Sequence, residues 1–449
     1  MSVVALQLGQ CGNQLGSTWF EALIHDVRPA PGPPRTDDAC YREAALERYF
    51  HSPKCGVLPL AGLPEARAVL VDMERKVVAR SVAMAARSGE WRYADGAAVC
   101  RTSGSANNWA YGFAGPGEHC LSEAMESVRA QVERCDRLSG FLAMMSVAGG
   151  TGSGLGTRLC IRLRDAYPKA GLLNHLTWPY STGEVIVQNY NAVLTLAHLH
   201  GCSDALLVQQ NDRTHRVCAQ LLRRPAVSFS HLNAVVAAQL AGRLRVRVPV
   251  IASPFCVALC GHHPGELLQA LVPHPELKLL SLHAVPQLPE SSRDFTRYDW
   301  KGLLQELHRE TQSKVSNPPA LTRRVLCCVA GPAPPPTSLA RLLVLRGPDA
   351  HATPLGFQRT PMALPWVPPE AALAVWSERR APTGYGKSAT LLANDTAVIS
   401  PVEHAVSKAW RMFVSRAYVH QYTHHGVSEE DFLDSFTLLE QVIASYRQL

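Results

Sequence analysis

Apolar runs typical of strands alternate with helix-spaced patterns through the first half of the chain. The strand-like runs are residues 3–8, 68–73, 141–147, 175–179 and 204–210. Between two of them, a helix is predicted over 118–138, where apolar residues recur on one helical face: Leu121, Met125, Val128 and Val132. Strands that alternate with helices in this way predict a doubly wound, mostly parallel α/β sheet.

The pattern changes after Asn211, where helical spacing predicts three further helices with mixed strands among them. Ser428 followed by three acidic residues is a typical helix start, because Ser can cap free backbone N–H groups and acids favour the positive end of the helix. We therefore expect four units: an α/β domain over 1–228, a core helix over 229–243, a mixed α/β domain over 244–400 and a helical hairpin over 401–449.

Pro and Gly are dense over 27–64 and 317–336, which predicts two long surface loops inserted into a regular scaffold. The longest apolar stretch, 246–260, is interrupted by Pro249 and Pro254, so we expect no membrane-spanning helix. The first residues lack the basic region of a signal peptide and fit a strand, which predicts a cytosolic protein.

Composition narrows the class of protein further. An apolar share of 47% over 449 residues predicts a globular protein with a sizeable core, and 13 scattered Cys without a CxxC pair predict mostly reduced thiols. The net charge of +7 favours acidic partners. It gives little support for nucleic acid, because the Arg clusters lack interleaved aromatic residues.

A glycine-rich segment, AGGTGSG at 148–154, directly follows the buried-type strand FLAMMSV and directly precedes a predicted helix. Glycines allow backbone amides to approach an anion, and a helix N-terminus adds free N–H groups and a positive dipole end. Thr151 and Ser153 add hydroxyl donors. The segment therefore predicts a phosphate-binding loop; a glycine turn without a ligand is the alternative.

Two common phosphate motifs do not fit this segment. A P-loop needs Lys and then Ser or Thr after its last glycine, where this chain has Leu155 and Gly156. A dinucleotide fingerprint needs a glycine where Leu155 or Thr157 stands, which argues against a dehydrogenase. Residues 381–388 end like a P-loop but lack its first glycine and a preceding strand, so we interpret Lys387 as a surface residue at a strand start.

AGGTGSG together with GQCGNQ at 9–14 resembles the tubulin superfamily, in which a glycine loop holds the phosphates of GTP. Further matches occur in order: VDME at 71–74, SANNWAYG at 105–112, VQNYN at 187–191, LVPHPE at 271–276 and AYVHQYT at 417–423. The resemblance covers nearly the whole chain. It implies a tubulin-type fold, with a GTP-binding sheet, a core helix, a second mixed α/β domain and a C-terminal helical hairpin.

The resemblance implies which residues bind GTP or GDP with Mg²⁺. The residues at the family's phosphate-binding positions are Gln10, Cys11, Ser146, Gly149, Gly150, Thr151 and Gly152, with Asn107 and Asn108 closing over the terminal phosphate. Asp72 and Glu74 supply carboxylates where the family places its magnesium. Each of these also has an ordinary alternative, such as a helix start, a turn or a core thiol, and it is their joint order that favours the site.

Guanine would be read by Asn211 and Asn233, since an amide offers both a donor and an acceptor. Phe229 stands where the family has a tyrosine stacked on the base, which keeps the aromatic face. Ala148 and Ala106 replace two family glycines, and their methyl groups crowd places where backbone approaches the ligand. The resemblance therefore implies nucleotide binding more firmly than hydrolysis.

Hydrolysis in the superfamily is shared between stacked subunits, because a carboxylate from the next molecule activates the attacking water. Glu266 matches that position, so the resemblance implies a catalytic role for it in trans. A solvated helix carboxylate is the alternative. We expect a slow GTPase at most, completed only by a partner subunit.

Within the superfamily, the phrases NNWAYG, WPYSTGEVIVQNYN, VPHPE and EEDFLDSFTLLEQVIASY resemble the delta class. That class implies a cytoskeletal protein of the cytoplasm, centrosome, centriole and basal body, with the nucleus as a further location, needed for triplet microtubules and cilia. Its partners would be other tubulins, through longitudinal or lateral contacts, and centriolar proteins. The basic charge and the missing acidic tail predict that it does not substitute freely in a microtubule wall. The alternative is a non-polymerising GTP-binding adaptor that recruits centriolar partners.

Overall fold

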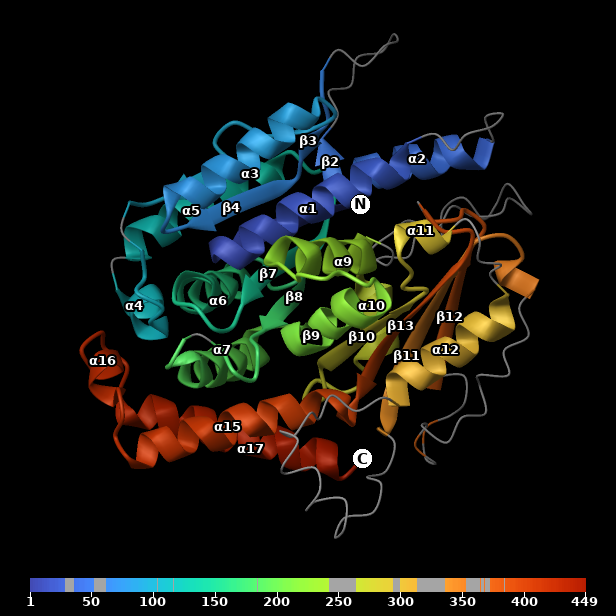
Figure 1. The fold of residues 1–449 in the computed structure, drawn as a ribbon. Coiled ribbons are helices and arrows are strands. Elements are labelled where there is room, and N and C mark those ends of the chain that lie inside the picture. Colours follow the sequence, from blue (N-terminus) through green and yellow to red (C-terminus); the bar gives the residue numbers. More distant parts are fainter. Residues whose placement is uncertain are drawn as a thin grey trace, which may run out of the picture.

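The protein is described here from a computed structural model, which covers residues 1–28, 36–51, 62–102, 104–115, 117–183, 185–241, 264–293, 299–312, 336–352, 364, 367, 372–382 and 384–449. Within these ranges, ten strands form one continuous sheet in the order β12-β11-β13-β10-β9-β8-β7-β1-β4-β6. Helices cover both faces of that sheet (Figure 1). None of the described helices is both long and apolar enough to cross a bilayer.

The N-terminal half supplies the six parallel strands from β9 to β6 in that order. Its sheet strands are β1 Ser2–Leu8, β4 Ala68–Asp72, β6 Ala98–Cys100, β7 Leu138–Ser146, β8 Gly171–Trp178 and β9 Ala205–Gln210, and a small second sheet holds β2 Phe50–His51, β3 Glu65–Ala66 and β5 Arg92–Tyr93. Its helices are α1 Gly9–Val27, α2 Thr36–Tyr49, α3 Arg75–Ser88, α4 Trp109–Ala114, α5 Gly117–Glu133, α6 Gly156–Ala166, α7 Gln188–Cys202, α8 Asn211–Arg216 and α9 Phe229–Ala241.

The second half extends the same sheet with mixed strands. β10 Leu279–Val285 pairs parallel with β9 and antiparallel with β13 Ser388–Asp395. On the other side of β13, β11 Ser338–Arg346 pairs antiparallel with it, and β12 Leu373–Glu378 pairs parallel with β11. The helices here are α10 Pro264–Leu271, α11 Glu290–Arg293, α12 Trp300–Gln312, α15 Ile399–Val414, α16 Val419–Thr423 and α17 Glu429–Arg447. Figure 1 shows α15 and α17 as an antiparallel hairpin along the outside of the molecule.

Two apolar cores lie on opposite faces of the sheet. One joins the sheet to α4–α7 and the C-terminal hairpin, and it includes Leu159, Tyr190 and Phe432. The other joins the sheet to α1, α2, α3, α9 and α10 through residues such as Trp19 and Val236. A sheet buried on both faces explains why its strands are continuously apolar.

The α/β class with a mostly parallel sheet is confirmed. The five strand-like runs form β1, β4, β7, β8 and β9, and the capping box at Ser428 starts α17 as its sequence indicates. The helix expected over 118–138 ends at Glu133, because the chain turns before β7 begins. The four proposed unit boundaries remain a prediction; the sheet itself runs without a break from β9 to β10.

The expectation of one long loop over 27–64 is wrong for its middle part, where α2 and β2 lie. The prolines and glycines are confined to the flanks, and 36–49 contains neither, so a helix can form there. Tyr41 and Tyr49 bury their rings and anchor α2 to the core. The second loop, expected over 317–336, and the apolar stretch 246–260 lie almost wholly outside the described residues.

Candidate nucleotide-binding site

The residues predicted to bind phosphate and magnesium lie at the carboxyl ends of three neighbouring parallel strands, on the same side of the sheet. Leu8 of β1 pairs with Val71 of β4, and Gln7 pairs with Met144 of β7. Because the strands are parallel and in register, their carboxyl ends place the start of α1, Asp72 and Ser146 side by side. The strand order therefore assembles the site predicted from separate motifs.

Glycines are needed at two positions beside these strand ends, because other parts of the chain approach their backbone too closely for a Cβ. A Cβ on Gly9, whose φ is +69°, would lie 2.7 Å from the Gly152 nitrogen. A Cβ on Gly150 would lie 2.5 Å from Ser105 Oγ and 2.7 Å from the Asn108 carbonyl oxygen. The glycine loop thus packs directly against the α1 turn and against the segment 104–108, leaving no room for side chains at Gly9 or Gly150.

Gly149 differs from its neighbours because the protein leaves space beside it. The nearest atom that a Cβ at Gly149 would meet is Asn107 Oδ1, at 3.8 Å. Asn107 is exposed, and Gly149 is partly exposed. Backbone that is free of Cβ contact and faces an exposed amide side chain fits a phosphate cradle.

The loop leads into a π-helical turn, Thr151–Leu155, which continues as α6. Thr151 Oγ1 shares a 2.9 Å hydrogen bond with Ser105 Oγ, which ties the two loops together. The expectation that Ser153 offers its hydroxyl to a phosphate is wrong, because Ser153 is fully buried and its hydroxyl donates to the Gly149 carbonyl. The turn directs this side chain back into the loop.

Asp72 and Glu74 form the carboxylate side of the site. One oxygen of Asp72 accepts a hydrogen bond from the Glu74 backbone N–H at 3.3 Å, and the other, Oδ2, is buried without a hydrogen-bond partner. Burial raises the pKa of Asp72 from its ordinary value to about 6. A Cβ on Gly104 would lie 3.2 Å from Glu74 Oε1, so this carboxylate borders the 104–108 segment.

An unpartnered buried carboxylate oxygen beside a phosphate-binding loop fits a bound hard cation, which would supply the missing partner. Among the described residues, no group of three or more His, Cys, Asp and Glu side chains gathers around one point. A Mg²⁺ ion here would therefore share its coordination among few carboxylates, phosphate oxygens and water, as this ion usually does.

The two neighbouring asparagines differ in their surroundings. Asn107 is exposed, whereas Asn108 is buried and caps α4 by accepting from the Tyr111 N–H at 3.2 Å. Asn108 Nδ2 also donates to the Gln421 carbonyl of α16 at 3.0 Å. Asn107 is thus free to face a ligand while Asn108 orders the loop behind it; direct phosphate contacts of either remain a prediction.

Gln10 and Cys11 lie in the first turn of α1, where N–H groups of a helix face the site. Gln10 is exposed and Cys11 is partly exposed. Burial raises the pKa of the Cys11 thiol, with a hydrogen bond to Thr177 acting in the opposite direction. Cys11 is therefore a neutral thiol that can pack against a ligand.

The expected guanine end of the site lies at the carboxyl ends of β8 and β9. Asn211 begins α8 directly after β9, and Asn233 follows Phe229 by one turn on α9, which packs against α8. Phe229 is 56% exposed, and its ring lies 6.3 Å from that of Tyr180. An exposed ring beside two partly buried amides suits a stacked purine base.

Glu266 does not join these residues within the chain. It is exposed in the first turn of α10, and two residues further on Leu268 approaches Gly171 at the start of β8. The glycine loop follows the opposite, carboxyl end of the strands. α10 therefore packs on a face of the sheet near the amino ends of the strands, away from the predicted phosphate cradle.

Sequence reasoning missed Asn191, which joins the two loops that are predicted to face phosphate. Its Nδ2 donates to the Asn107 carbonyl at 2.8 Å and to the Ala148 carbonyl at 2.7 Å. Its Oδ1 accepts from the Trp109 N–H at 3.1 Å and from the Tyr422 hydroxyl at 2.6 Å. Its motif, VQNYN, was visible, but no local signal separates this amide from its neighbours.

Comparisons with known proteins agree with this geometry. A model of the Tubulin/FtsZ family, GTPase domain, matches residues 2–219. The chain is 42% identical over 462 residues to the tubulin delta chain of Homo sapiens, 43% over 469 residues to that of Canis lupus familiaris and 42% over 463 residues to that of Mus musculus. Each alignment spans 100% of both proteins.

The chain belongs to the tubulin family. It is a tubulin-type cytoskeletal protein, and its similarity to delta chains extends from end to end. The family's GTPase domain implies that this tubulin binds a guanine nucleotide and interacts with other tubulins. The matched span holds the glycine loop, Asp72 and Asn211, whereas Phe229 and Asn233 follow it on α9.

Proposed function

We propose that this tubulin binds GTP and GDP with Mg²⁺ at the strand edge described above and acts at the centriole and basal body, in the formation or maintenance of triplet microtubules and in cilium assembly. The full-length similarity to delta chains supports the cellular role. The proposed locations are the cytoplasm, the centrosome and the basal body, with the nucleus in addition. Its proposed partners are other tubulins and centriolar proteins.

The open space at Gly149 is the observation that carries the nucleotide site. Every other described glycine of the loop is packed against protein within 3 Å of its missing Cβ, but Gly149 faces only Asn107 at 3.8 Å. Phosphates placed there would meet the backbone of Gly149 and Gly150 and the first turn of the helix that starts at Thr151. Gln10, Ser146 and Gly152 would complete the cradle.

Mg²⁺ would be held through Asp72 and Glu74. The ion would neutralise phosphate charge, and it would partner the Asp72 oxygen that has no hydrogen bond. Asn211, Asn233 and Phe229 would select and stack guanine, and Asn107 would close over the terminal phosphate. The chain's own contribution is thus to bind and orient the nucleotide.

We place the water-activating group on a neighbouring subunit. The position of α10 near the amino ends of the strands supports this, because a stacked copy or another tubulin would bring its glycine loop to Glu266. A carboxylate at that point can orient and polarise the attacking water. Hydrolysis would then be slow in the isolated chain and faster in a stack.

The first experiment identifies the nucleotide released from purified, acid-denatured protein by chromatography, and then measures GTP turnover with and without added tubulin dimers. We expect stoichiometric guanine nucleotide and a turnover that requires the partner. Glu266→Ala should abolish the partner-dependent turnover of the partner's GTP. Gln269→Ala, an exposed change on the same helix, is the matched control and should leave it intact.

The outcomes separate the competing functions. Bound guanine nucleotide without turnover under any partner would favour a non-polymerising adaptor over a stacked GTPase. Turnover that survives Glu266→Ala would remove the role in trans. Bound NAD or no nucleotide would contradict the nucleotide site altogether.

A second experiment addresses the cellular role. Depletion of the chain from ciliated cells that express it should convert triplets to doublets or singlets in electron micrographs of centriole cross-sections. Re-expression of the wild-type chain should restore the triplets. Intact triplets and cilia after complete depletion would contradict the centriolar role while leaving nucleotide binding untouched.

A further inference from the structure

Asn191 is a fully satisfied amide at the junction of the two phosphate-facing loops. Both hydrogens of its Nδ2 are used, one by the Asn107 carbonyl of the first loop and one by the Ala148 carbonyl of the second. Its side chain is completely buried, so neither bond competes with water. Together with the hydrogen bond between Ser105 and Thr151, this side chain sets the distance between the loops and hence the width of the cradle at Gly149.

The C-terminal hairpin reaches the same junction from outside the nucleotide-binding domain. The Tyr422 hydroxyl of α16 donates to Asn191 Oδ1 at 2.6 Å, and the Gln421 carbonyl accepts from Asn108 Nδ2 at 3.0 Å. Figure 1 shows α16 beside α4 at one end of the hairpin. Two consecutive residues of α16 therefore contact two different asparagine side chains, Gln421 that of Asn108 and Tyr422 that of Asn191.

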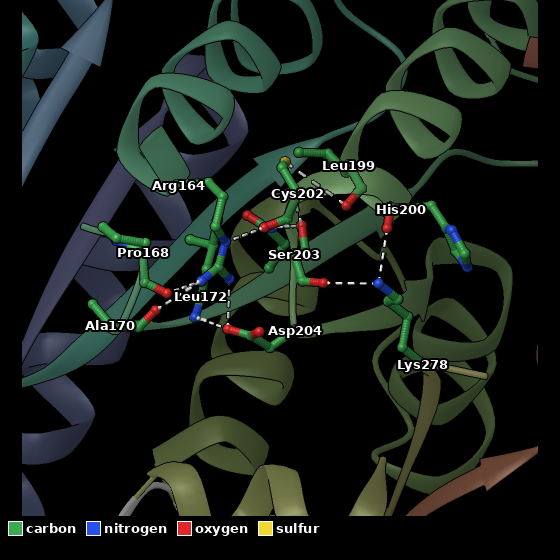
Figure 2. Close-up of polar contacts among 11 residues, drawn as sticks. Arg164, Pro168, Ala170, Leu172, Leu199, His200, Cys202, Ser203, Asp204 and Lys278 are labelled. Carbon is green, nitrogen blue, oxygen red and sulfur yellow. Dashed lines mark hydrogen bonds and ion pairs between the residues drawn. The ribbon is translucent and has the colours of Figure 1, made fainter. Parts of the chain in front are cut away.

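The helix that carries Asn191 is anchored at its other end by two cations. Lys278 Nζ donates to the carbonyls of His200 and Ser203 at 2.9 and 3.0 Å, and Arg164 Nε donates to the Cys202 carbonyl at 2.8 Å. Figure 2 shows the two side chains converging on the C-terminal end of α7. Cations at this end stabilise the helix, because they donate to its last carbonyls and interact favourably with the negative end of the helix dipole. A displacement of the loops is therefore not readily absorbed by sliding of α7.

We propose that Asn191 is a positioning residue of the nucleotide site and that its bond to Tyr422 couples nucleotide occupancy to the conformation of α16. The inference rests on the proposed nucleotide function. Nucleotide bound between the loops favours one separation of Asn107 and Ala148, Asn191 follows that separation, and the Tyr422 hydroxyl transmits it to the hairpin. Because coupling between two sites is reciprocal, a partner that holds α16 would in turn alter nucleotide release.

Tyr422→Phe tests the coupling with the smallest change, because only the hydroxyl is lost and Asn191 Oδ1 keeps its bond from the Trp109 N–H. Tyr446→Phe is the matched control: its hydroxyl is equally buried in the same hairpin but bonds Asn394 Oδ1 and the Leu279 N–H, away from the loops. We expect Tyr422→Phe to speed release of a fluorescent GTP analogue by roughly threefold to tenfold. Tyr446→Phe should release it at the wild-type rate.

Hydrogen exchange supplies a readout that a merely structural role would not change. In the wild type and in Tyr446→Phe, GTP should slow exchange both in the loop 148–152 and in the segment 417–425. In Tyr422→Phe, protection of the loop should persist and protection of 417–425 should be lost. Equal protection of 417–425 in Tyr422→Phe, or an unchanged release rate, would overturn the coupling.

Asn191→Asp tests the positioning role, since the carboxylate has the same shape but cannot donate to the two carbonyls. It should release nucleotide faster than Tyr422→Phe does. Release at the wild-type rate would overturn the role of Asn191; if this variant does not fold, the Tyr422→Phe comparison still decides the coupling. A wild-type protein that binds no guanine nucleotide would instead overturn the proposed function.

Discussion

The hydroxyl of Ser281 donates a hydrogen bond to the carboxylate of Asp395 at 3.0 Å, joining β10 to the end of β13 in the buried part of the sheet. Burial raises the pKa of Asp395 to about 6, although Ser281 and the Ala397 N–H donate to its charged form. Burial is therefore the stronger effect, and folding shifts the protonation equilibrium of Asp395 toward the neutral acid.

We expect the free energy of unfolding to depend on pH because the pKa of Asp395 is raised in the folded state. A raised native pKa means that the folded state binds more protons between pH 4 and pH 6, so the contribution of Asp395 is largest at low pH and is lost as pH rises through 6. Asp395→Asn should remove roughly 2 kcal/mol of that dependence in denaturant titrations at pH 4.5 and 7.5. Asp434→Asn on the surface of α17 should not; an unchanged slope in Asp395→Asn would contradict the assignment.

Ala106 adopts a left-handed backbone conformation, with φ of 49°. This conformation is unfavourable for a residue with a Cβ, so Ala106→Gly should stabilise the protein by about 1 kcal/mol. The same change at Ala110, which is buried inside α4, should destabilise it by at least as much. Thermal unfolding of the two variants should therefore shift in opposite directions, and a lowered melting temperature for Ala106→Gly would contradict the strain.

Lys278 is buried, and burial lowers the pKa of its ammonium group. Lys278→Met keeps the apolar stem but leaves the carbonyls of His200 and Ser203 without their donor, which should cost about 1–3 kcal/mol of unfolding free energy. Lys169→Met, at an exposed position, should change it by less than about 0.5 kcal/mol. Equal effects of the two substitutions in chemical denaturation would show that the carbonyl contacts contribute little.

Asp72→Asn should separate magnesium binding from nucleotide binding. Removal of the ion by EDTA should speed GTP release from the wild type, because the phosphates lose a bridging cation. The variant should release GTP quickly with or without EDTA, while Asp95→Asn, a change in an exposed turn, should behave as the wild type. An EDTA effect of the same size in Asp72→Asn would place the ion elsewhere.

The fold was largely predictable because its signals are local. The strand FLAMMSV and the face formed by Leu155, Leu159 and Leu163 carry the periods of their elements, and all three leucines are buried. α2 was missed because prolines on both sides of it suggested a loop through the whole segment. A short Pro-free stretch with buried Tyr41 and Tyr49 was the signal that could have revealed it.

Sequence motifs predicted which segments meet at the carboxyl ends of the strands, but not the bonds that connect these segments; the ligand contacts of the individual residues stay predictions. Motif order predicted the loops and the carboxylates, because each follows a strand end. The bond between Asn191 and Tyr422 joins residues 231 positions apart, and nothing in either local sequence encodes the pairing. Ser153 likewise looked like a ligand donor until the π-helical turn directed its hydroxyl to Gly149.

The most direct test of the central claim compares two glycines that both have room for a methyl group. A Cβ at Gly149 would meet no protein atom closer than 3.8 Å, and a Cβ at Gly201 in α7 would meet none within 4 Å. Both Gly149→Ala and Gly201→Ala should therefore fold. If phosphates occupy the space at Gly149, equilibrium titration with a fluorescent GTP analogue should show affinity reduced by about tenfold or more in Gly149→Ala and unchanged in Gly201→Ala. Wild-type affinity in a folded Gly149→Ala protein would contradict the phosphate cradle.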